Sequence, residues 1–383
     1  MDILKLNPVS NLVAENLGDN YTLLSESENP VGIILRSFDM HGYDLPESVL
    51  AIARAGAGVN NIPCEEYAQK GVVVFNTPGA NANAVNELVI TALLLGSRKI
   101  VPSIEWVKTL KGTENISKQV EKGKKDFVGR EIAGKKLGVI GLGAIGARVA
   151  NSAVALNMEV LGYDPYLSVT SALHLSRHVE VTSDLDELYK SCDYITIHVP
   201  YTKDNDKMIN GAKISKMKDG VVIINCARGE LVDNQAVLEN IKIGKVARYF
   251  CDFPSEELIG IDGVVLTPHL GASTPEAEDN CAVMAAKELK DYIENGNVNN
   301  SVNFPRCSAP RMAEKRITIC HKNVHGMIAK FSTIMGENEV NIENFVNSSK
   351  GDFAYSILDV SSVSDEIVEN LKKIDGVIKV RVL

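Results

Sequence analysis

Short runs of valine, isoleucine and leucine recur along the chain as far as Leu266, and stretches with a helical pattern separate them. Strands that are apolar along their whole length are buried on both faces, as in parallel sheets covered by helices on either side. The pattern therefore predicts an α/β protein built from two doubly wound, Rossmann-like domains. The expected strands lie within "VGIILRS", "VLAIARAGAG", "GVVVFNTPGA", "KKLGVIGLGAIG", "MEVLGYDP", "DYITIHVP", "GVVIINCARGE", "VARYFCDF" and "VVLTPHLGAST".

Two long helical segments suggest how these strands divide into domains. The segment "NAVNELVITALLLGSRKIV" is expected to leave the first sheet, and "TPEAEDNCAVMAAKELKDYIENG" to return to it. We therefore predict a first domain of residues 1–96 and 276–306, a second domain of residues 97–275, and a cleft between them. A polar segment with two prolines then forms a linker.

Residues 313–383 have a different pattern from the rest of the chain. Their order of apolar strands and amphipathic helices is βαββαβ, which predicts an antiparallel sheet with two helices on one face. The segments are "RITICHK", "GMIAKFSTIMGENE", "VNIENFVNSSK", "FAYSILDVSS", "SDEIVENLKKIDG" and "VIKVRVL".

The composition and charge of the chain disfavour several classes of partner. A total of 40 lysines and arginines against 49 acidic residues gives a net charge of −9, which disfavours nucleic acid and anionic membranes. The longest apolar stretch, near residues 88–95, is far shorter than the ~20 residues of a membrane span, and the N-terminus lacks a secretion-signal pattern. Seven scattered cysteines without a C-x-x-C pair predict reduced, mostly buried thiols. We expect a cytoplasmic protein.

A glycine-rich turn follows the strand "KLGVI". Gly141, Gly143 and Gly146 have G-x-G-x-x-G spacing, and Asp164 closes the next strand. The glycines allow a tight turn and a close approach of a pyrophosphate, and the N-terminus of the following helix, at Ala144 and Ile145, favours the negative charge. A carboxylate at Asp164 can accept from ribose hydroxyls and would repel a 2′-phosphate. The segment therefore predicts a dinucleotide site that prefers NAD to NADP.

Three functional side chains are expected at the ends of later strands, which is where open α/β sheets bind their ligands. Arg228 can bind a carboxylate with two hydrogen bonds and polarise the neighbouring carbonyl group. His269 can take a hydroxyl proton while hydride leaves the same carbon for the nicotinamide. Glu257 beside His269 would favour the imidazolium and orient the ring. The set indicates oxidation of a 2-hydroxy acid.

The motifs "GLGAIG", "YDP", "HVP", "NCARGELVD", "DFPSEE" and "PHLGAST" resemble the D-isomer-specific 2-hydroxyacid dehydrogenases over residues 1–306. "ILRS", "ARAGAGVNNI" and "FNTPGANANAVNELV" resemble the branch that oxidises D-3-phosphoglycerate at the start of serine synthesis. The resemblance implies that Arg228, Glu257 and His269 are catalytic, with Glu256 as the rival of Glu257. It also implies further NAD contacts at Pro200, Cys226, Ala227, Asp252 and Gly271. Cys226 itself extends a buried strand and has no adjacent base, so we interpret it as structural.

The resemblance also places the substrate contacts. Arg36, Ser37 and Asn81 match positions that bind the substrate phosphate and carboxylate, and the backbone N–H groups around Ala57, Gly58 and Val59 match those that hold the carboxylate. An arginine at the end of "GIIL" and a glycine-rich turn after "VLAIAR" both suit an anion.

The C-terminal βαββαβ segment resembles an ACT domain, a small-molecule sensor attached to enzymes of amino-acid synthesis. His321, Asn323 and Asn341 match its effector-binding positions, although His325 stands where proline is usual. The resemblance implies L-serine as an effector and a homodimer or homotetramer, with oligomerisation alone as the alternative. His321 and His325 lack a third metal ligand nearby, so no metal site is expected.

Two other functions remain open. The first is a dehydrogenase of the same family acting on glyoxylate, hydroxypyruvate or another unphosphorylated acid, for which a second anion contact at Arg36 and Ser37 would be unnecessary. The second is an NAD-responsive binding protein without catalytic activity. An assay of NADH formation distinguishes such a binding protein from an enzyme.

Overall fold

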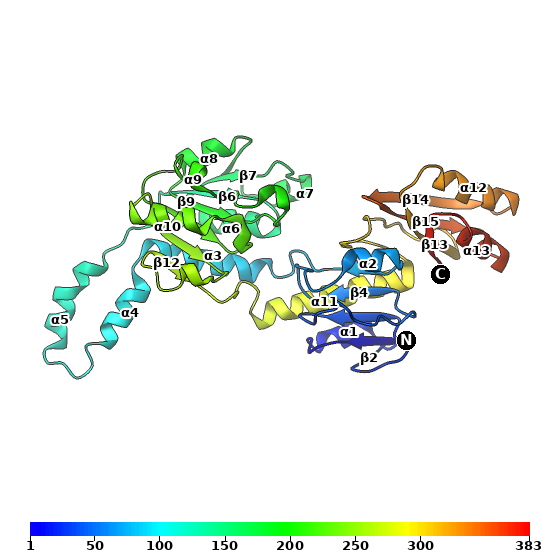
Figure 1. Cartoon of the computed structure of the whole chain (residues 1–383), viewed down its shortest axis with the longest axis horizontal. Coiled ribbons are helices and arrows are strands. Elements are labelled where there is room, and N and C mark those ends of the chain that lie inside the picture. Colours follow the sequence, from blue (N-terminus) through cyan, green and yellow to red (C-terminus); the bar gives the residue numbers. More distant parts are fainter. The chain divides into compact units, whose positions relative to one another are not determined.

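The computed structural model describes residues 1–383 except for the side chain of Thr170. The chain forms two compact units (Figure 1). The first unit comprises Met1–Asn81 and Pro275–Leu383, and the second comprises Ala82–Thr274. Each unit contains a parallel sheet, and the first also contains an antiparallel sheet formed by the C-terminal residues, so the predicted fold class is confirmed.

The second unit is built on a seven-stranded sheet of order β12-β11-β10-β9-β6-β7-β8. All its neighbouring strands are parallel. The chain adds strands outward from β6 in one direction and then resumes on the other side at β9, so the order reverses between β6 and β9. The strands are β6 (Lys136–Ile140), β7 (Glu159–Tyr163), β8 (Val179–Thr182), β9 (Tyr194–Ile197), β10 (Val221–Asn225), β11 (Val246–Cys251) and β12 (Val264–Leu266).

Helices of the second unit pack on this sheet through small and branched side chains. Val85, Val89 and Leu93 of α3 (Ala82–Ser97) share a buried cluster with Val149 of α6 (Ala144–Ala155) and Val222 of β10. The remaining helices are α4 (Ile100–Lys108), α5 (Ile116–Gly123), η1 (Lys124–Phe127), α7 (Val169–Leu173), α8 (Leu185–Ser191), η2 (Lys203–Asn205), α9 (Gly211–Ile214), η3 (Gly229–Leu231), α10 (Asn234–Lys242) and η4 (Glu256–Leu258).

The first unit contains a five-stranded parallel sheet of order β2-β1-β3-β4-β5. Cys281, Ala285 and Leu289 of its long helix α11 (Pro275–Asn295) are buried against this sheet. Four alanines in this helix, at 277, 282, 285 and 286, are buried, and their small side chains let the helix lie close to the strands. The other elements are β1 (Asp2–Lys5), α1 (Leu12–Leu17), β2 (Thr22–Leu24), β3 (Gly32–Leu35), β4 (Ala51–Arg54), α2 (Cys64–Gln69) and β5 (Val73–Phe75).

One of the two boundaries between the units differs from the boundary predicted from the sequence. The second unit begins at Ala82, because α3 packs on α6 and β10, whereas the sequence boundary falls at residue 96. The return to the first unit at Pro275 lies within one residue of the expected position. The C-terminal residues belong to the first unit in this division, and a separate domain at residues 313–383 stays a prediction.

The C-terminal residues form a four-stranded antiparallel sheet of order β14-β15-β13-β16 with the expected βαββαβ sequence of elements. Phe331 of one helix and Ile367 of the other join Ile319 and Leu358 of the sheet in one buried cluster. The elements are β13 (Lys315–Lys322), α12 (Met327–Glu337), β14 (Ile342–Lys350), β15 (Phe353–Val360), α13 (Asp365–Lys372) and β16 (Val377–Val382).

The other face of this antiparallel sheet packs on the end of α11. Cys320 and Tyr355 lie in the same buried cluster as Tyr292 and Phe304. The Tyr355 hydroxyl donates to the Gly296 carbonyl at 2.8 Å, and the Arg381 guanidinium lies 4.7 Å from the centre of the Tyr292 ring. The C-terminal sheet is therefore joined to the long helix by apolar and polar contacts as well as by the chain itself.

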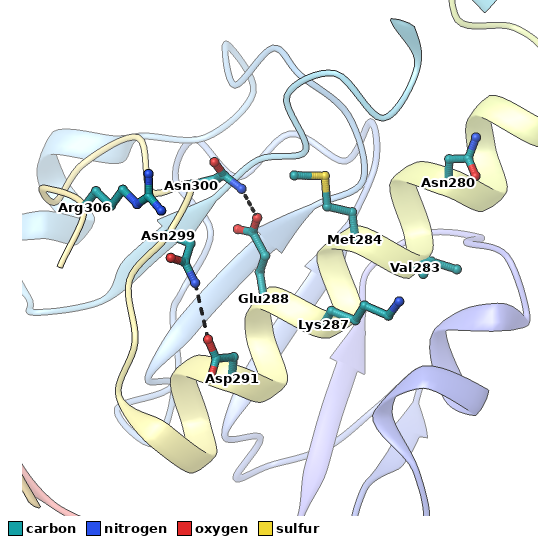
Figure 2. A pocket seen from close by; sticks show the side chains of 9 residues that line it. All are labelled: Asn280, Val283, Met284, Lys287, Glu288, Asp291, Asn299, Asn300 and Arg306. Carbon is teal, nitrogen blue, oxygen red and sulfur yellow. Dashed lines mark hydrogen bonds between the residues drawn. The ribbon is translucent and has the colours of Figure 1, made fainter. Parts of the chain in front are cut away.

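A pocket of about 660 Å³ lies between α11 and the segment that leads to the C-terminal sheet (Figure 2). Glu288 points from the helix towards Asn300 and accepts a hydrogen bond from its side-chain amide. Glu288 is only 7% exposed. Its Oε2 atom has no hydrogen-bond partner within the described part of the chain. Burial outweighs the hydrogen bonds from Asn300 and raises the pKa of Glu288 from 4.5 to about 7.

This raised pKa predicts a pH-dependent loss of stability. The folded protein binds the Glu288 proton more tightly than the unfolded chain does, so the free energy of unfolding falls as the pH rises from 4.5 to about 7. The slope from this one group approaches about 1.4 kcal/mol per pH unit. Glu288→Gln removes the titration, and we expect this variant to be more stable than the wild type at pH 8 by up to about 3 kcal/mol. Urea unfolding at several pH values measures both effects.

The exposed Glu276 at the start of the same helix supplies the matched control. Glu276→Gln should leave the pH dependence unchanged. If the free energies of unfolding of the wild type and of Glu288→Gln changed in parallel between pH 4.5 and 7, the raised pKa would be contradicted.

None of the helices in the described residues combines the length and apolar composition that a membrane span requires. Six of the seven cysteines are buried and only Cys64 is partly exposed, which agrees with the expected burial of the thiols.

Candidate active site

The glycine-rich turn joins β6 to α6 at the point where the strand order reverses, which is the usual ligand position in such sheets. Gly141 has a positive φ of 92°, and a Cβ there would lie 2.6 Å from the His198 carbonyl oxygen. A Cβ at Gly146 would lie 1.8 Å from the carbonyl oxygen of Gly141, so the helix can approach the turn only with glycine. At Gly143 a Cβ would meet no described atom within 4 Å. The turn thus leaves open space at the N-terminus of α6, and these residues fit a dinucleotide pyrophosphate.

Asp164 lies at the end of β7 and holds the same turn. Its Oδ2 accepts from the backbone N–H of Leu142 at 2.9 Å, and its Oδ1 accepts from that of Tyr166 at 2.8 Å. Each carboxylate oxygen can accept a further hydrogen bond. The position therefore suits a ribose diol, and Asp164 both orders the turn and supplies negative charge.

Asp164→Ala is expected to lower kcat/KM with NAD by about 10- to 100-fold, the effect of losing hydrogen bonds to a charged group. The discrimination against NADP should decrease because the negative charge is gone. Steady-state kinetics with both cofactors test this. Asp262→Ala, at an exposed loop position, is the control. An unchanged ratio between NAD and NADP would count against the proposed role of Asp164.

His198 was not among the predicted site residues, although it directly follows β9 and lies two residues before Pro200. Its backbone N–H donates to the Ile140 carbonyl at 2.7 Å, and its Nε2 lies 2.9 Å from the Thr196 hydroxyl. Burial lowers the pKa of His198 to about 3, so the ring is neutral at physiological pH. The backbone of His198 packs against Gly141 of the glycine turn, and the neutral ring adds no positive charge there.

The three predicted catalytic residues follow adjacent parallel strands, β10, β11 and β12. Arg228 lies three residues after β10, where Asn225 orders the loop. The Asn225 amide donates to the Arg228 carbonyl at 2.8 Å, and its oxygen accepts from the Ala227 N–H at 3.1 Å. A Cβ at Gly229 would lie 3.3 Å from the Cβ of Phe253, and the Phe253 and His269 rings have centroids 4.8 Å apart. The structure therefore brings the loops of Arg228 and His269 together around Phe253.

The loop that carries His269 is organised by Asp252, which is 1% exposed. The Asp252 Oδ1 accepts from the Thr267 hydroxyl at 2.6 Å and the Leu270 N–H at 2.7 Å, and its Oδ2 accepts from the Gly271 N–H at 2.8 Å. His269 itself is exposed and has a φ of 57°, in the left-handed region. Backbone strain of this kind persists where surrounding bonds hold it, and it is frequent at functional sites. Cofactor contacts by Asp252 and Gly271 stay predictions.

Glu257 and Glu256 lie together in η4 and both are exposed. The Glu257 Oε1 accepts from the Asn234 side chain at 2.9 Å in this structure. Pairing of either acid with His269 stays a prediction. Cys226 is 8% exposed, and burial raises the pKa of its thiol, which fits the structural interpretation.

The predicted anion site in the first unit follows β3 and β4. Arg36 comes directly after β3, and its Nη1 pairs with Glu278 Oε1 at 2.5 Å. Arg54, which was not among the predicted site residues, ends the neighbouring strand and donates from Nε to the Arg36 carbonyl at 2.9 Å. The sequence indicates Arg54 by its place at the end of the apolar run "VLAIAR", which is the next apolar run after the one that Arg36 follows. The Asn76 side chain donates to the Ala57 carbonyl at 2.5 Å and holds the turn of residues 57–59.

Of the predicted effector residues, His321 lies in β13, Asn323 directly follows that strand and Asn341 directly precedes β14. His321 is 2% exposed, and its Nε2 lies 3.0 Å from the Ser356 hydroxyl. Its Nδ1 donates to the Lys322 carbonyl at 2.9 Å if this nitrogen carries the proton. Asn323 and Asn341 are exposed and donate to the Gly351 carbonyl and the Glu343 carboxylate. An effector role for the three residues stays a prediction.

Comparison with known proteins shows the family to which the chain belongs. Residues 91–271 match the family described as "D-isomer specific 2-hydroxyacid dehydrogenase, NAD binding domain". The "D-3-phosphoglycerate dehydrogenase" of Haemophilus influenzae is 33% identical over 354 residues, which cover 88% of this chain and 81% of that protein. The chain therefore belongs to the D-isomer specific 2-hydroxyacid dehydrogenase family, and its second unit carries the NAD-binding domain of that family.

Two further proteins extend the comparison. The "D-3-phosphoglycerate dehydrogenase" of Archaeoglobus fulgidus is 38% identical over 293 residues, 74% of this chain and 53% of that protein. The chain thus spans about half the length of this relative. The solved structure of "cofactor(NAD+) bound 3-phosphoglycerate dehydrogenase in Entamoeba histolytica" superposes with a TM-score of 0.61 at 27% identity, covering 79% of this chain and 98% of that one.

Proposed function

We propose that this protein oxidises D-3-phosphoglycerate to 3-phosphohydroxypyruvate with NAD, the first step of phosphorylated serine synthesis, in the cytoplasm. The observation that carries the proposal is the combination of a family NAD-binding domain with two arginines, Arg36 and Arg54, side by side at adjacent strand ends of the other unit. An unphosphorylated hydroxy acid would not need this additional cationic site.

The proposed chemistry uses the groups at the ends of β10 and β12. Arg228 binds the substrate carboxylate and polarises the neighbouring C–O bond. His269 takes the proton of the C2 hydroxyl, and a NAD held by the glycine turn and Asp164 would supply the acceptor for the hydride that leaves C2. Glu257, or its neighbour Glu256, stabilises the imidazolium that results. Asp252 keeps His269 in place through its bonds to the loop backbone.

The anionic ends of the substrate have separate partners in this proposal. The phosphate binds Arg36 and Arg54, with Ser37 and Asn81 supplying hydrogen bonds. The backbone N–H groups at residues 57–59 suit a carboxylate.

A homodimer or homotetramer is part of the proposal, because a pair of helices presents apolar side chains to solvent. Figure 1 shows α4 and α5 projecting together from the seven-stranded sheet. Val101, Ile104, Val107 and Ile116 on these helices are each 47–52% exposed. Such a patch marks a protein interface more often than a free surface. Within the oligomer, L-serine is proposed as an effector at His321, Asn323 and Asn341, coupled to turnover through the C-terminal sheet.

NADH formation from D-3-phosphoglycerate and NAD at alkaline pH, with and without millimolar L-serine, tests the proposal. We expect turnover with phosphoglycerate and a lower rate when serine is present. Activity that ignores serine would leave the C-terminal sheet an oligomerisation module. Turnover of D-glycerate or hydroxypyruvate but not of the phosphorylated substrate would mean that Arg36 and Arg54 serve another purpose. Binding of NAD without turnover of any of these acids would favour an NAD-responsive binding protein.

A further inference from the structure

Arg36 already has an anionic partner within its own chain. Its Nη1 and the Glu278 Oε1 are 2.5 Å apart, and Glu278 lies in the first turn of α11. The two residues are far apart in sequence, and the fold of the first unit brings them together. They line one pocket of about 540 Å³, together with Ala55, which directly follows Arg54.

The second acid in this pocket is engaged elsewhere. Asp279 accepts a hydrogen bond from the Ser10 hydroxyl at 2.5 Å. Glu278 is therefore the carboxylate that neutralises Arg36. The side chains of Arg36 and Glu278 are 39% and 45% exposed, so water and salt screen the pair. Exposed pairs of this kind contribute little stability and are readily exchanged for another partner.

We infer that Glu278 is an internal substitute for the substrate's anionic group, which occupies Arg36 in the free protein and sets the affinity for phosphorylated substrates. The inference rests on the proposed function, since it takes Arg36 as the phosphate contact. A phosphate that binds Arg36 must displace the Glu278 carboxylate. The displaced carboxylate stays in the same pocket and repels the incoming dianion. Glu278 thereby weakens phosphate binding, and a neutral side chain of the same shape relieves both effects.

Glu278→Gln tests the inference, with Glu276→Gln as the matched control. Both glutamates lie in the first turn of α11 and carry the same charge, but only Glu278 contacts Arg36. We expect Glu278→Gln to lower the KM for 3-phosphoglycerate about two- to fivefold, which is the worth of an exposed ion pair. The inhibition constant of inorganic phosphate should fall by a similar factor. Glu276→Gln should change neither value.

A double-variant comparison shows whether the effect passes through Arg36. In an Arg36→Gln background, adding Glu278→Gln should lower KM by less than it does in the wild type, because the pair is already broken and only the repulsion of the phosphate remains to be relieved. An unchanged or raised KM in Glu278→Gln, an equal fall in Glu276→Gln, or a gain that is undiminished without Arg36 would each overturn the inference. Calorimetric titration with inorganic phosphate measures its affinity for each variant without any turnover. This measurement therefore decides the role of Glu278 even if another acid proves to be the substrate.

Discussion

Replacing His269 by alanine is expected to reduce kcat by about 10²- to 10⁴-fold, the usual contribution of a positioned acid–base group. The residue is exposed at the end of β12, and its ring lies against Phe253. Alanine leaves no group there to take the C2 hydroxyl proton. The loss should appear in kcat more than in NAD affinity, because the glycine turn is formed by other strands. Stopped-flow hydride transfer and NAD titration by fluorescence measure the two quantities separately.

The left-handed backbone at His269 calls for a second variant. Alanine is disfavoured at a φ of 57°, whereas asparagine adopts this region readily. His269→Asn therefore keeps the loop geometry but removes the base, and we expect it to be as inactive as the alanine variant. Activity retained in His269→Asn would show that the residue supports the loop and does not transfer the proton.

Replacing Arg316 by methionine is expected to lower the free energy of unfolding by about 3–5 kcal/mol, because it leaves a buried carboxylate unpaired. Arg316 and Asp359 are both fully buried, and two hydrogen bonds of 2.6 and 2.9 Å join them. The guanidinium also donates to the carbonyls of Asn295, Ala309 and Pro310, which join α11 to the C-terminal sheet. Urea unfolding of the whole protein measures the loss.

Two comparisons isolate the buried pair. Arg311→Met removes a nearby arginine that is exposed, so it should change the stability by no more than about 0.5 kcal/mol. Arg316→Met combined with Asp359→Leu removes both charges, and we expect it to recover part of the lost stability. A loss below about 1 kcal/mol in Arg316→Met would mean that water reaches the Asp359 carboxylate.

Several site features could be predicted from local sequence because a local rule requires them. Gly141 needs a positive φ, and Gly146 meets the carbonyl of Gly141 only a few residues away. Arg228 and His269 follow apolar strands, and parallel strands place their carboxyl ends on one edge of a sheet. Arg54 could have been found in the same way, since it ends the strand that pairs with the one before Arg36.

Other features depend on residues that are distant in sequence. The Asp252 carboxylate accepts hydrogen bonds from the backbone of the His269 loop, a role that its own strand does not indicate. Glu257 meets Asn234 of α10, a neighbour that the spacing around "DFPSEE" does not indicate. His321 is buried and lies within hydrogen-bond distance of the Ser356 hydroxyl, which belongs to a different strand of the C-terminal sheet.

By itself, the amino-acid sequence determined the α/β class, the two parallel sheets, the βαββαβ order of the C-terminal residues and the NAD turn. These depend on periodicity and on glycine positions, which act over a few residues. Only the tertiary structure decided that α3 packs with the second unit, that the C-terminal sheet joins the end of α11 and that Glu278 neutralises Arg36. The reason is physical: each of these contacts joins segments far apart in the chain, and their meeting depends on how whole helices and sheets pack.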